Sequence, residues 1–258
     1  MSALEGHRIL IVNDDGITAP GIRLLAKLMR ERADDVWVVA PAEERSGASS
    51  SVSMHMPIRV HDQGEREFAI SGTPTDAVIM AFSQLMPEPP TLVLSGINRG
   101  ANLGDDIHYS GTIAAAAEAT QCGVPAIALS QVFTSGQPVP WGTAERYAVP
   151  VIEQLLALGV PAGTFLNVNF PSVAPEAVVG IRAAHQAARP PRMFRAEARI
   201  DCREVPYYWP RLCPEPGGDL PGTDLAAIAE GAIAICPIKL NRTDSDYIMR
   251  VSENPFLL

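Results

Sequence analysis

The sequence is poor in cysteine and in positive charge, and these two shortages exclude several classes of protein. Its four cysteines, in 258 residues, form no CxxC pair and no zinc-type spacing, which argues against a disulfide framework and a structural zinc site. The chain has 20 Lys and Arg residues against 29 Asp and Glu residues, and therefore a net charge of −9. Because so acidic a chain repels the DNA backbone, we expect no long nucleic acid as a partner.

Long apolar runs and several catalytic motifs are also missing. The apolar runs are too short to cross a bilayer, and the first residues lead directly into a predicted strand without a signal peptide. We therefore expect a cytoplasmic protein with reduced cysteines and no membrane partner. The sequence contains no Walker loop, no GxGxxG after the first strand and no GxSxG elbow. These absences argue against a Walker-type nucleotide site, a dinucleotide oxidoreductase and a serine esterase.

Short apolar runs alternate with helical patterns along most of the chain. The runs lack the alternation of half-buried strands and are typical of strands buried on both faces. They occur at Arg8–Val12, Val36–Ala40, Leu92–Leu94, Ala126–Leu129, Phe165–Val168 and Ala232–Ile235, and the helical patterns at Ile22–Arg32, Ala77–Leu85, Thr112–Cys122 and Glu145–Leu158. This order predicts an α/β fold, a three-layer Rossmann-like and mostly parallel sheet with helices on both faces.

The alternation fails between residues 186 and 222, where proline, arginine and aromatic residues are frequent. Val205–Trp209 has the composition of a strand, so this region is either an extended hairpin or a long surface loop. We expect residues 1–185 to form the α/β catalytic core and residues 186–222 the hairpin. Residues 223–258 are expected to return a helix and a strand to the core before a tail.

Two adjacent carboxylates follow the first predicted strand, in the sequence Asn13-Asp14-Asp15-Gly16. Ligands of an open parallel sheet bind beyond the carboxyl ends of its strands. Carboxylate and amide oxygens at this position suit Mg²⁺ or Mn²⁺. The same residue types also favour turns and helix caps, so this cluster alone leaves a metal site and a plain turn open.

A second polar cluster, Glu43–Gly47, follows the second predicted strand at the same edge of the sheet. The hydroxyl of Ser46 could complete a metal shell, and Arg45 could hold a charged partner. The serine-rich residues that follow favour a flexible polar loop when this cluster is considered alone.

The third cluster is a glycine- and asparagine-rich stretch, Ser95–Gly104, which follows the third predicted strand. Glycine allows the backbone to approach a ligand closely. The next motif, Ser110-Gly111-Thr112, stands at a predicted helix start, where N–H groups and the helix dipole bind anions. A residue that only caps a helix does not require so long a glycine- and asparagine-rich segment before it, so the pattern indicates a phosphate site.

In this order the motifs resemble those of the survival protein SurE family of 5′-nucleotidases, which are acid-phosphatase-like, metal-dependent phosphatases. The resemblance extends from Ile9 to about Pro237. It is carried by Asn13–Gly16, Glu44–Ser46, Ser71–Asp76, Ser95–Gly104 and Tyr109–Thr112, and later by Leu166–Asn169, Tyr207–Trp209 and Thr223–Asp224.

The resemblance implies a specific site and assembly. One divalent metal ion per subunit, Mg²⁺ or Mn²⁺, is expected to bind Asp14, Asp15, Ser46 and Asn98. The phosphate pocket is expected to contain Asn102, Ser110, Gly111 and Thr112, and we add Asn13 beside the two aspartates. The family also forms homodimers or homotetramers in which an extended C-terminal hairpin is exchanged between subunits.

We therefore expect a metal-dependent phosphomonoesterase that acts on nucleoside 5′- and 3′-monophosphates, with polyphosphate as a further substrate class. Asp14 and Asp15 are the expected catalytic residues, and whether either one acts as nucleophile, acid or base stays open. A haloacid-dehalogenase-type phosphatase needs aspartates separated by one residue, whereas these two are adjacent. The alternative is a non-catalytic nucleotide-binding module that only holds phosphate.

Overall fold

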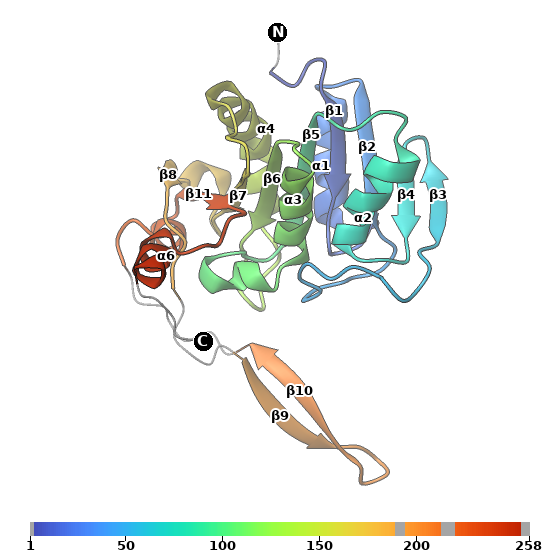
Figure 1. Ribbon diagram of the computed structural model, residues 1–258, viewed down its shortest axis with the longest axis vertical. Coiled ribbons are helices and arrows are strands. Elements are labelled where there is room, and N and C mark those ends of the chain that lie inside the picture. The colour runs from blue at the N-terminus through green and yellow to red at the C-terminus, as the bar shows by residue number, and fades with distance from the viewer. Residues whose placement is uncertain (1–2, 189–193, 213–219, 254–258) are drawn as a thin grey trace.

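The computed structural model describes residues 3–188, 194–212 and 220–253, and a nine-stranded sheet forms its centre (Figure 1). The strands of this sheet are β1 (Arg8–Val12), β2 (Asp35–Pro41), β3 (Val60–Gly64), β4 (Glu67–Ile70), β5 (Leu92–Arg99), β6 (Ala126–Gln131), β7 (Thr164–Phe170), β8 (Ile181–Ala183) and β11 (Ile233–Lys239). The helices are α1 (Pro20–Arg30), α2 (Pro74–Met80), α3 (Gly111–Gln121), α4 (Trp141–Leu158), α5 (Asp224–Ala229) and α6 (Ser245–Ser252). None of the helices in these ranges combines the length and apolarity needed to cross a membrane.

The strand order is β3-β4-β2-β1-β5-β6-β7-β11-β8. All neighbours from β4 to β7 are parallel, whereas β3 is antiparallel to β4 and β11 is antiparallel to β7. The mostly parallel α/β sheet predicted from the sequence is therefore confirmed. The chain builds outward from β1 to β2 and β4, then returns to add β5 on the other side of β1. The order reverses between β1 and β5, and such a switch point is where open sheets bind ligands.

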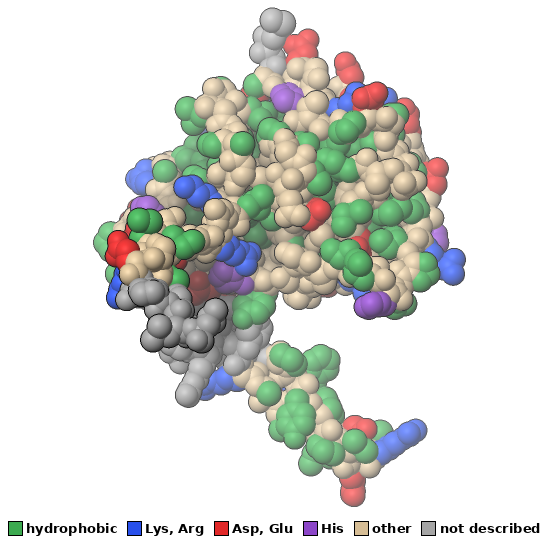
Figure 2. All heavy atoms as spheres, in the orientation of Figure 1, with side chains coloured by type: hydrophobic (Ala, Val, Ile, Leu, Met, Phe, Trp, Pro, Cys, Tyr) green, Lys and Arg blue, Asp and Glu red, His purple; other side chains and the backbone are tan. Residues whose placement is uncertain are grey.

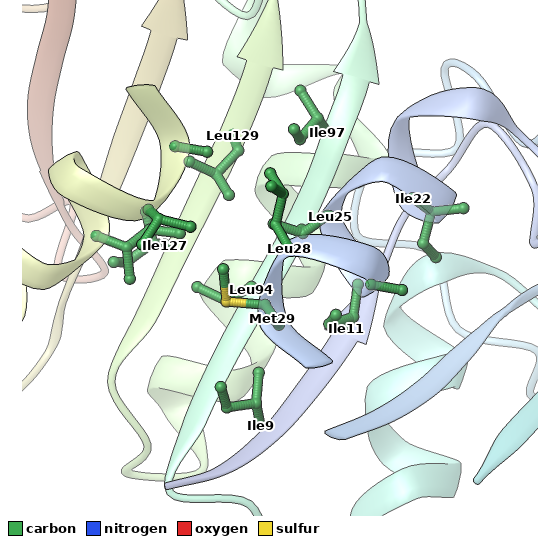
Figure 3. Close-up of a cluster of buried hydrophobic side chains, with 14 of the residues drawn as sticks. Ile9, Ile11, Ile22, Leu25, Leu28, Met29, Leu94, Ile97, Ile127 and Leu129 are labelled. Carbon is green, nitrogen blue, oxygen red and sulfur yellow. The ribbon is translucent and has the colours of Figure 1, made fainter. Parts of the chain in front are cut away.

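Helices cover both faces of the sheet because alternate residues of each buried strand point to opposite faces. Ile9 and Ile11 of β1 pack with Leu25 and its neighbours on α1, in a core that also includes α4. Figure 3 shows this cluster between α1 and the sheet. Leu10 and Val12 pack on the other face, against α2 and α3. Burial on both faces explains why β1 forms a continuous apolar run in the sequence.

The third predicted strand is longer than the apolar run Leu92–Leu94 indicated. β5 continues through Arg99, and its register with β6 shifts between Ser95 and Asn98. Asn98 is thus the penultimate residue of a strand and not part of a loop. The structure also adds strands β3, β4 and β8, which the sequence did not predict.

A separate two-stranded sheet, formed by β9 (Phe194–Ile200) and β10 (Pro206–Leu212), projects away from the body of the molecule (Figure 1). Asp201 closes its turn, because one carboxylate oxygen accepts N–H bonds from Arg203 at 2.8 Å and from Val205 at 2.9 Å. This finding decides between the two readings of the region in favour of the hairpin. Residues 189–193, 213–219 and 254–258, parts of the predicted hairpin region and tail, lie outside the described residues.

Three cysteines of the described ranges are free thiols, and Cys213 lies outside those ranges. Burial, together with the nearby charge of Asp224, raises the pKa of Cys236 to about 12. A thiol with so high a pKa is almost never ionised, so Cys236 is a poor nucleophile.

Glu67 links strand β4 to helix α1 through two ion pairs. Its carboxylate binds the guanidinium groups of Arg23 and Arg30, with the second contact at 2.8 Å. Burial acts to raise the pKa of Glu67, but the hydrogen bonds and charges of the two arginines outweigh it, and the pKa is lowered. The ion pairs therefore stabilise the folded state when Glu67 is ionised.

We predict that Glu67→Gln lowers the free energy of unfolding by about 1–2 kcal/mol at neutral pH, because the partly exposed arginines lose their charged partner. The folded pKa lies below its ordinary value of 4.5, so the difference from the parent is fully present above about pH 4.5 and disappears as the pH falls through the folded pKa. Urea unfolding at a series of pH values measures this. Glu65→Gln, an exposed change in the neighbouring turn, is the control, and a pH-independent difference for Glu67→Gln would contradict the prediction.

Candidate active site

The carboxylate of Asp14 lies against the N-terminus of α3 and is buried, with 4% of the residue exposed. The Thr112 hydroxyl donates to Oδ1 at 2.6 Å, and the Gly111 N–H donates to Oδ2 at 3.2 Å. Ser110 caps the same helix, since its hydroxyl oxygen accepts the Ile113 N–H at 3.1 Å. The end of β1 and the start of α3 thus form one continuous polar site, in which the positive end of the helix favours negative charge.

This contact requires glycine at position 111. A Cβ atom there would lie 2.8 Å from the Asp14 Cβ and 2.8 Å from the Pro74 Cγ. Any side chain at this position would therefore push the Asp14 carboxylate away from the helix. The glycine of the Ser-Gly-Thr motif is needed for close approach of β1, α2 and α3.

Asp15 joins the end of β1 to the end of β5. Its Oδ2 accepts the backbone N–H of Arg99 at 2.8 Å. Burial, more than any other effect, raises the pKa of Asp15 to about 6; the negative charges of Asp14 and Glu44 act in the same direction, against the Arg99 hydrogen bond. Burial also raises the pKa of Asp14, against the hydrogen bonds from α3. Both carboxylates are therefore in surroundings that do not fully compensate their negative charge.

Asn98 lies at the end of β5, next to the residue that binds Asp15. Its amide nitrogen donates to the Gly100 carbonyl at 3.1 Å. This bond fixes the orientation of the amide and leaves the oxygen as the end of the side chain that can accept a ligand. Asn98 thus directly precedes Arg99, whose N–H binds Asp15.

The segment that contains Ser46 is held beside Asp14, although its hydroxyl is not directed there. The Arg45 N–H donates to the backbone carbonyl of Asp14 at 2.7 Å. The Ser46 hydroxyl donates to Glu44 Oε1 at 2.8 Å, and Ser46 is exposed. The loop that contains Ser46 therefore lies beside Asp14, but the Ser46 hydroxyl is oriented toward the Glu44 side chain, and its role as a metal ligand stays a prediction.

Further along, the same loop is anchored to α2 by a buried carboxylate. Asp76 accepts the Ser53 N–H at 3.0 Å, the Ser53 hydroxyl at 2.7 Å and the Thr73 N–H at 2.8 Å. Burial acts to raise the pKa of Asp76, but these hydrogen bonds outweigh it, and the pKa is lowered. Asp76 is thus ionised and links the loop after β2 to the start of α2.

Asn102 is buried and forms the centre of an amide network that fixes the loop between β5 and α3 (residues 100–110, the β5–α3 loop). Its side-chain nitrogen donates to the Ser130 hydroxyl at 2.8 Å, and its backbone N–H donates to Asn169 Oδ1 at 2.9 Å. Its carbonyl accepts the amide nitrogens of Asn167 at 2.8 Å and Asn169 at 3.0 Å. The Asn102 side chain therefore faces β6 and holds the pocket wall in this structure.

The sequence analysis assigned no function to Ser130, Asn167 and Asn169. A signal was present, because Asn167 and Asn169 are separated by one residue in a mostly apolar strand. Such spacing places two amides on one face of a buried strand, where they need polar partners.

Asn13 is fully buried beside Asp14. Its amide nitrogen donates to the Gly16 carbonyl at 2.8 Å, whereas its amide oxygen is buried without a hydrogen-bond partner among the described residues. A buried oxygen without a donor is unfavourable. This is the arrangement expected where a bound water or ion completes the site.

The donor groups fit a hard divalent cation. Two carboxylates, one amide oxygen and one hydroxyl lie on the two loops and one strand end that meet at the switch point, and such ligands suit Mg²⁺ or Mn²⁺. A divalent ion would balance the charges of Asp14 and Asp15. Within residues 3–188, 194–212 and 220–253, no three His, Cys, Asp or Glu side chains gather as a metal cluster. A metal at this site would thus depend on Ser46 and Asn98 for its other protein ligands.

Comparison with known proteins shows the family to which the chain belongs. The family described as "Survival protein SurE" matches residues 9–192. "5′-nucleotidase SurE" of Parvibaculum lavamentivorans is 46% identical over 248 residues, which cover 94% of this chain and 88% of the relative. The protein of the same name from Bradyrhizobium diazoefficiens is 44% identical over 245 residues, covering 93% and 96% of the two chains. The crystal structure of the SurE protein from Aquifex aeolicus matches with a TM-score of 0.82 and 32% identity, over 95% of this chain and 98% of that one. The resemblance inferred from the motifs is confirmed, and this chain belongs to the SurE family.

Proposed function

We propose that this protein is a metal-dependent phosphomonoesterase that releases phosphate from nucleoside 5′-monophosphates. The observation that carries the proposal is the Asp14 carboxylate set on the N-terminus of α3, with Asp15 beside it at the switch point of the sheet. A metal and an anionic phosphate can both bind there, because carboxylates attract the ion and the helix terminus attracts the phosphate. The names of the two relatives support a nucleotide as the substrate.

In this proposal Asp14, Asp15, Ser46 and Asn98 hold one Mg²⁺ or Mn²⁺ ion, which would supply a Lewis acid and an acidified water. The chain itself orients the reacting groups. Gly111 and Thr112 fix the Asp14 carboxylate, and the Arg99 N–H fixes that of Asp15. The start of α3, from Ser110 to Thr112, stabilises charge on the phosphate oxygens, while Asn13 and Asn102 support the pocket walls.

We predict that the purified protein releases phosphate from nucleoside 5′-monophosphates, that EDTA abolishes release, and that Mg²⁺ or Mn²⁺ restores it. Asp15→Asn should lower kcat/KM by about 10³-fold, because the amide cannot offer a charged ligand. Glu31→Gln, an exposed change beyond α1, is the matched control and should leave activity unchanged.

A panel of 5′- and 3′-monophosphates and polyphosphate defines the substrate. Binding of nucleotide without release under any metal would replace the enzyme by the non-catalytic nucleotide-binding module. Full activity of the double variant Asp14→Asn, Asp15→Asn would refute the proposed site even if the protein is a phosphatase.

Gly111→Ala tests the contact between Asp14 and α3. The added methyl group would overlap Asp14 and Pro74, so we predict a loss of kcat/KM of about 10- to 100-fold, the effect of small displacements in an active site. The control is Gly142→Ala, a similar change at the second residue of α4, where the nearest atom would lie at an ordinary 3.6 Å. Phosphate release and thermal unfolding are measured for both. Equal activity of the two variants would contradict this account of Gly111.

We also propose that the β9–β10 hairpin joins subunits in a homodimer or homotetramer. It exposes large apolar side chains, among them Ile200 at 72%, Tyr208 at 64% and Trp209 at 61%, and Figure 2 shows apolar groups along this arm. A lone two-stranded hairpin is marginally stable in water, and such exposed groups mark interaction surfaces.

The exposed free thiols of Cys122 and Cys202 suit a reducing compartment, and we propose a cytoplasmic location.

Trp209→Glu should shift the protein toward a smaller species, because it places a charge in the proposed interface. Sedimentation velocity over a range of concentrations measures the shift. Val179→Glu is the control, since Val179 is also exposed, at 57%, but lies outside the hairpin. A parent protein that is monomeric at all concentrations, or a variant that assembles as the parent does, would rule out this role of the hairpin.

A further inference from the structure

Asp224 is a buried carboxylate, 1% exposed, that links two segments distant in the sequence to the start of its own helix. It is the first residue of α5, directly after the hairpin region. Its Oδ2 accepts the Gly104 N–H at 2.8 Å, and its Oδ1 accepts the N–H groups of Ala187 at 3.0 Å and Leu225 at 2.9 Å. The side chain therefore does more than begin a helix, since only one of its three donors belongs to α5.

The residues around Asp224 join the chain segments that lead into and out of the β9–β10 hairpin. We call this junction the base of the hairpin. Before the hairpin, the His185 N–H donates to the Gly222 carbonyl at 2.9 Å, and the Asp224 N–H donates to the His185 carbonyl at 2.9 Å. The bond from Ala187 to Asp224 adds a third connection. The chain leaving for the hairpin and the chain returning from it are thus joined where Asp224 lies.

The hydrogen bond from Gly104 to Asp224 connects the base of the hairpin to the candidate active site. Gly104 lies in the β5–α3 loop, between Asn98 at the end of β5 and Gly111 at the start of α3. It has a φ of +54°, a conformation that glycine adopts readily, and it has no side chain with which to hold its own position. The position of its N–H depends on the acceptor, and a carboxylate is a stronger acceptor than a neutral oxygen.

The loop is also held from β7, by the amides of Asn167 and Asn169 on the backbone of Asn102. Asp224 and these asparagines therefore hold the same short segment from two sides. Other bonds also hold this loop, among them those from Ser49 and Gln186, but Asp224 accepts the Gly104 N–H with a carboxylate and comes from the segment that follows the hairpin.

We propose that Asp224 is a positioning residue for the reaction: it holds Gly104, and with it the β5–α3 loop, against the base of the hairpin. This rests on the proposed phosphatase function, because the loop joins a proposed metal ligand, Asn98, to the proposed phosphate site at α3. Asp224 need not touch the substrate. Loss of the Asp224 carboxylate would displace the β5–α3 loop and, with it, the groups at its two ends that are proposed to contact the transition state.

Asp224→Asn tests the proposal with little change in shape. An amide keeps one acceptor, and we expect its oxygen at the Oδ1 position, where it keeps the N–H bonds of Ala187 and Leu225. The NH₂ group then faces the Gly104 N–H, and the bond to the loop is lost. The matched control is Thr223→Ala. Thr223 caps α5, accepting the Ala226 N–H at 3.3 Å, and donates to the Leu220 carbonyl at 2.7 Å, but it makes no contact with Gly104. The control disturbs the same helix start and hairpin base while leaving the link to the loop intact.

Two measurements are made on the full-length, metal-loaded protein. Hydrogen exchange followed by mass spectrometry should show faster exchange in the peptide that contains Gly104 for Asp224→Asn, and not for Thr223→Ala. In phosphate release from a nucleoside 5′-monophosphate, kcat should fall about tenfold or more for Asp224→Asn and less than about twofold for Thr223→Ala, with KM changed little in both.

Equal kcat for the two variants, or unchanged exchange at Gly104, would overturn the proposal and leave Asp224 a residue of fold stability only. The two readouts also separate this proposal from the proposed function. If the parent protein releases no phosphate, the phosphatase assignment fails, and the exchange of the Gly104 peptide alone decides whether Asp224 holds the loop.

Discussion

Two adjacent carboxylates at the end of a buried strand are the constraint on which the rest of the site depends. Burial and mutual repulsion disfavour their ionised forms, which is why the pKa of Asp15 is raised to about 6. The protein compensates in part: Asp14 receives a hydroxyl and an N–H group from α3, and Asp15 receives the N–H of Arg99. Hydrogen-bond dipoles do not amount to a full positive charge, so the site keeps an excess of negative charge for which a divalent cation is the natural complement. The proposed binding of a metal and the placement of α3 thus follow from one electrostatic cause.

Buried polar acceptors hold the loops around these carboxylates in position. Asp76 holds the loop after β2, and Asn169 and Asp224 hold the β5–α3 loop. Each is nearly or fully buried and accepts a backbone N–H from a segment distant in sequence. The loss of such an acceptor leaves a buried donor unsatisfied, which costs about 1–3 kcal/mol. These hydrogen bonds give the loops defined positions, although the β5–α3 loop contains only a short 3₁₀ helix, Gly104–His108.

These contacts also explain how much the sequence could predict. The central strands are buried on both faces, so their apolar runs remain visible in the sequence. β3 is exposed along most of its length and β8 has three residues, so neither forms such a run. The clusters at Asp14 and Gly111 were expected at one edge because parallel strands end there. The bonds themselves were beyond prediction, since Thr112 reaches Asp14 across 98 residues and Gly104 reaches Asp224 across 120, and only the packed tertiary structure brings such pairs together.

The finished site has a fixed half and an adaptable half. Asp14, Thr112 and Asn102 are buried and anchored by hydrogen bonds, whereas Ser46 is exposed and its hydroxyl rests on Glu44. Rotating an exposed serine exchanges one surface hydrogen bond for another, whereas moving Asp14 would break two buried bonds and open the contact with α3. The energetics therefore favour movement of Ser46 toward an ion already held by the aspartates. In the proposed function, the fixed half would therefore position the phosphate, and Ser46 would adjust to the ion.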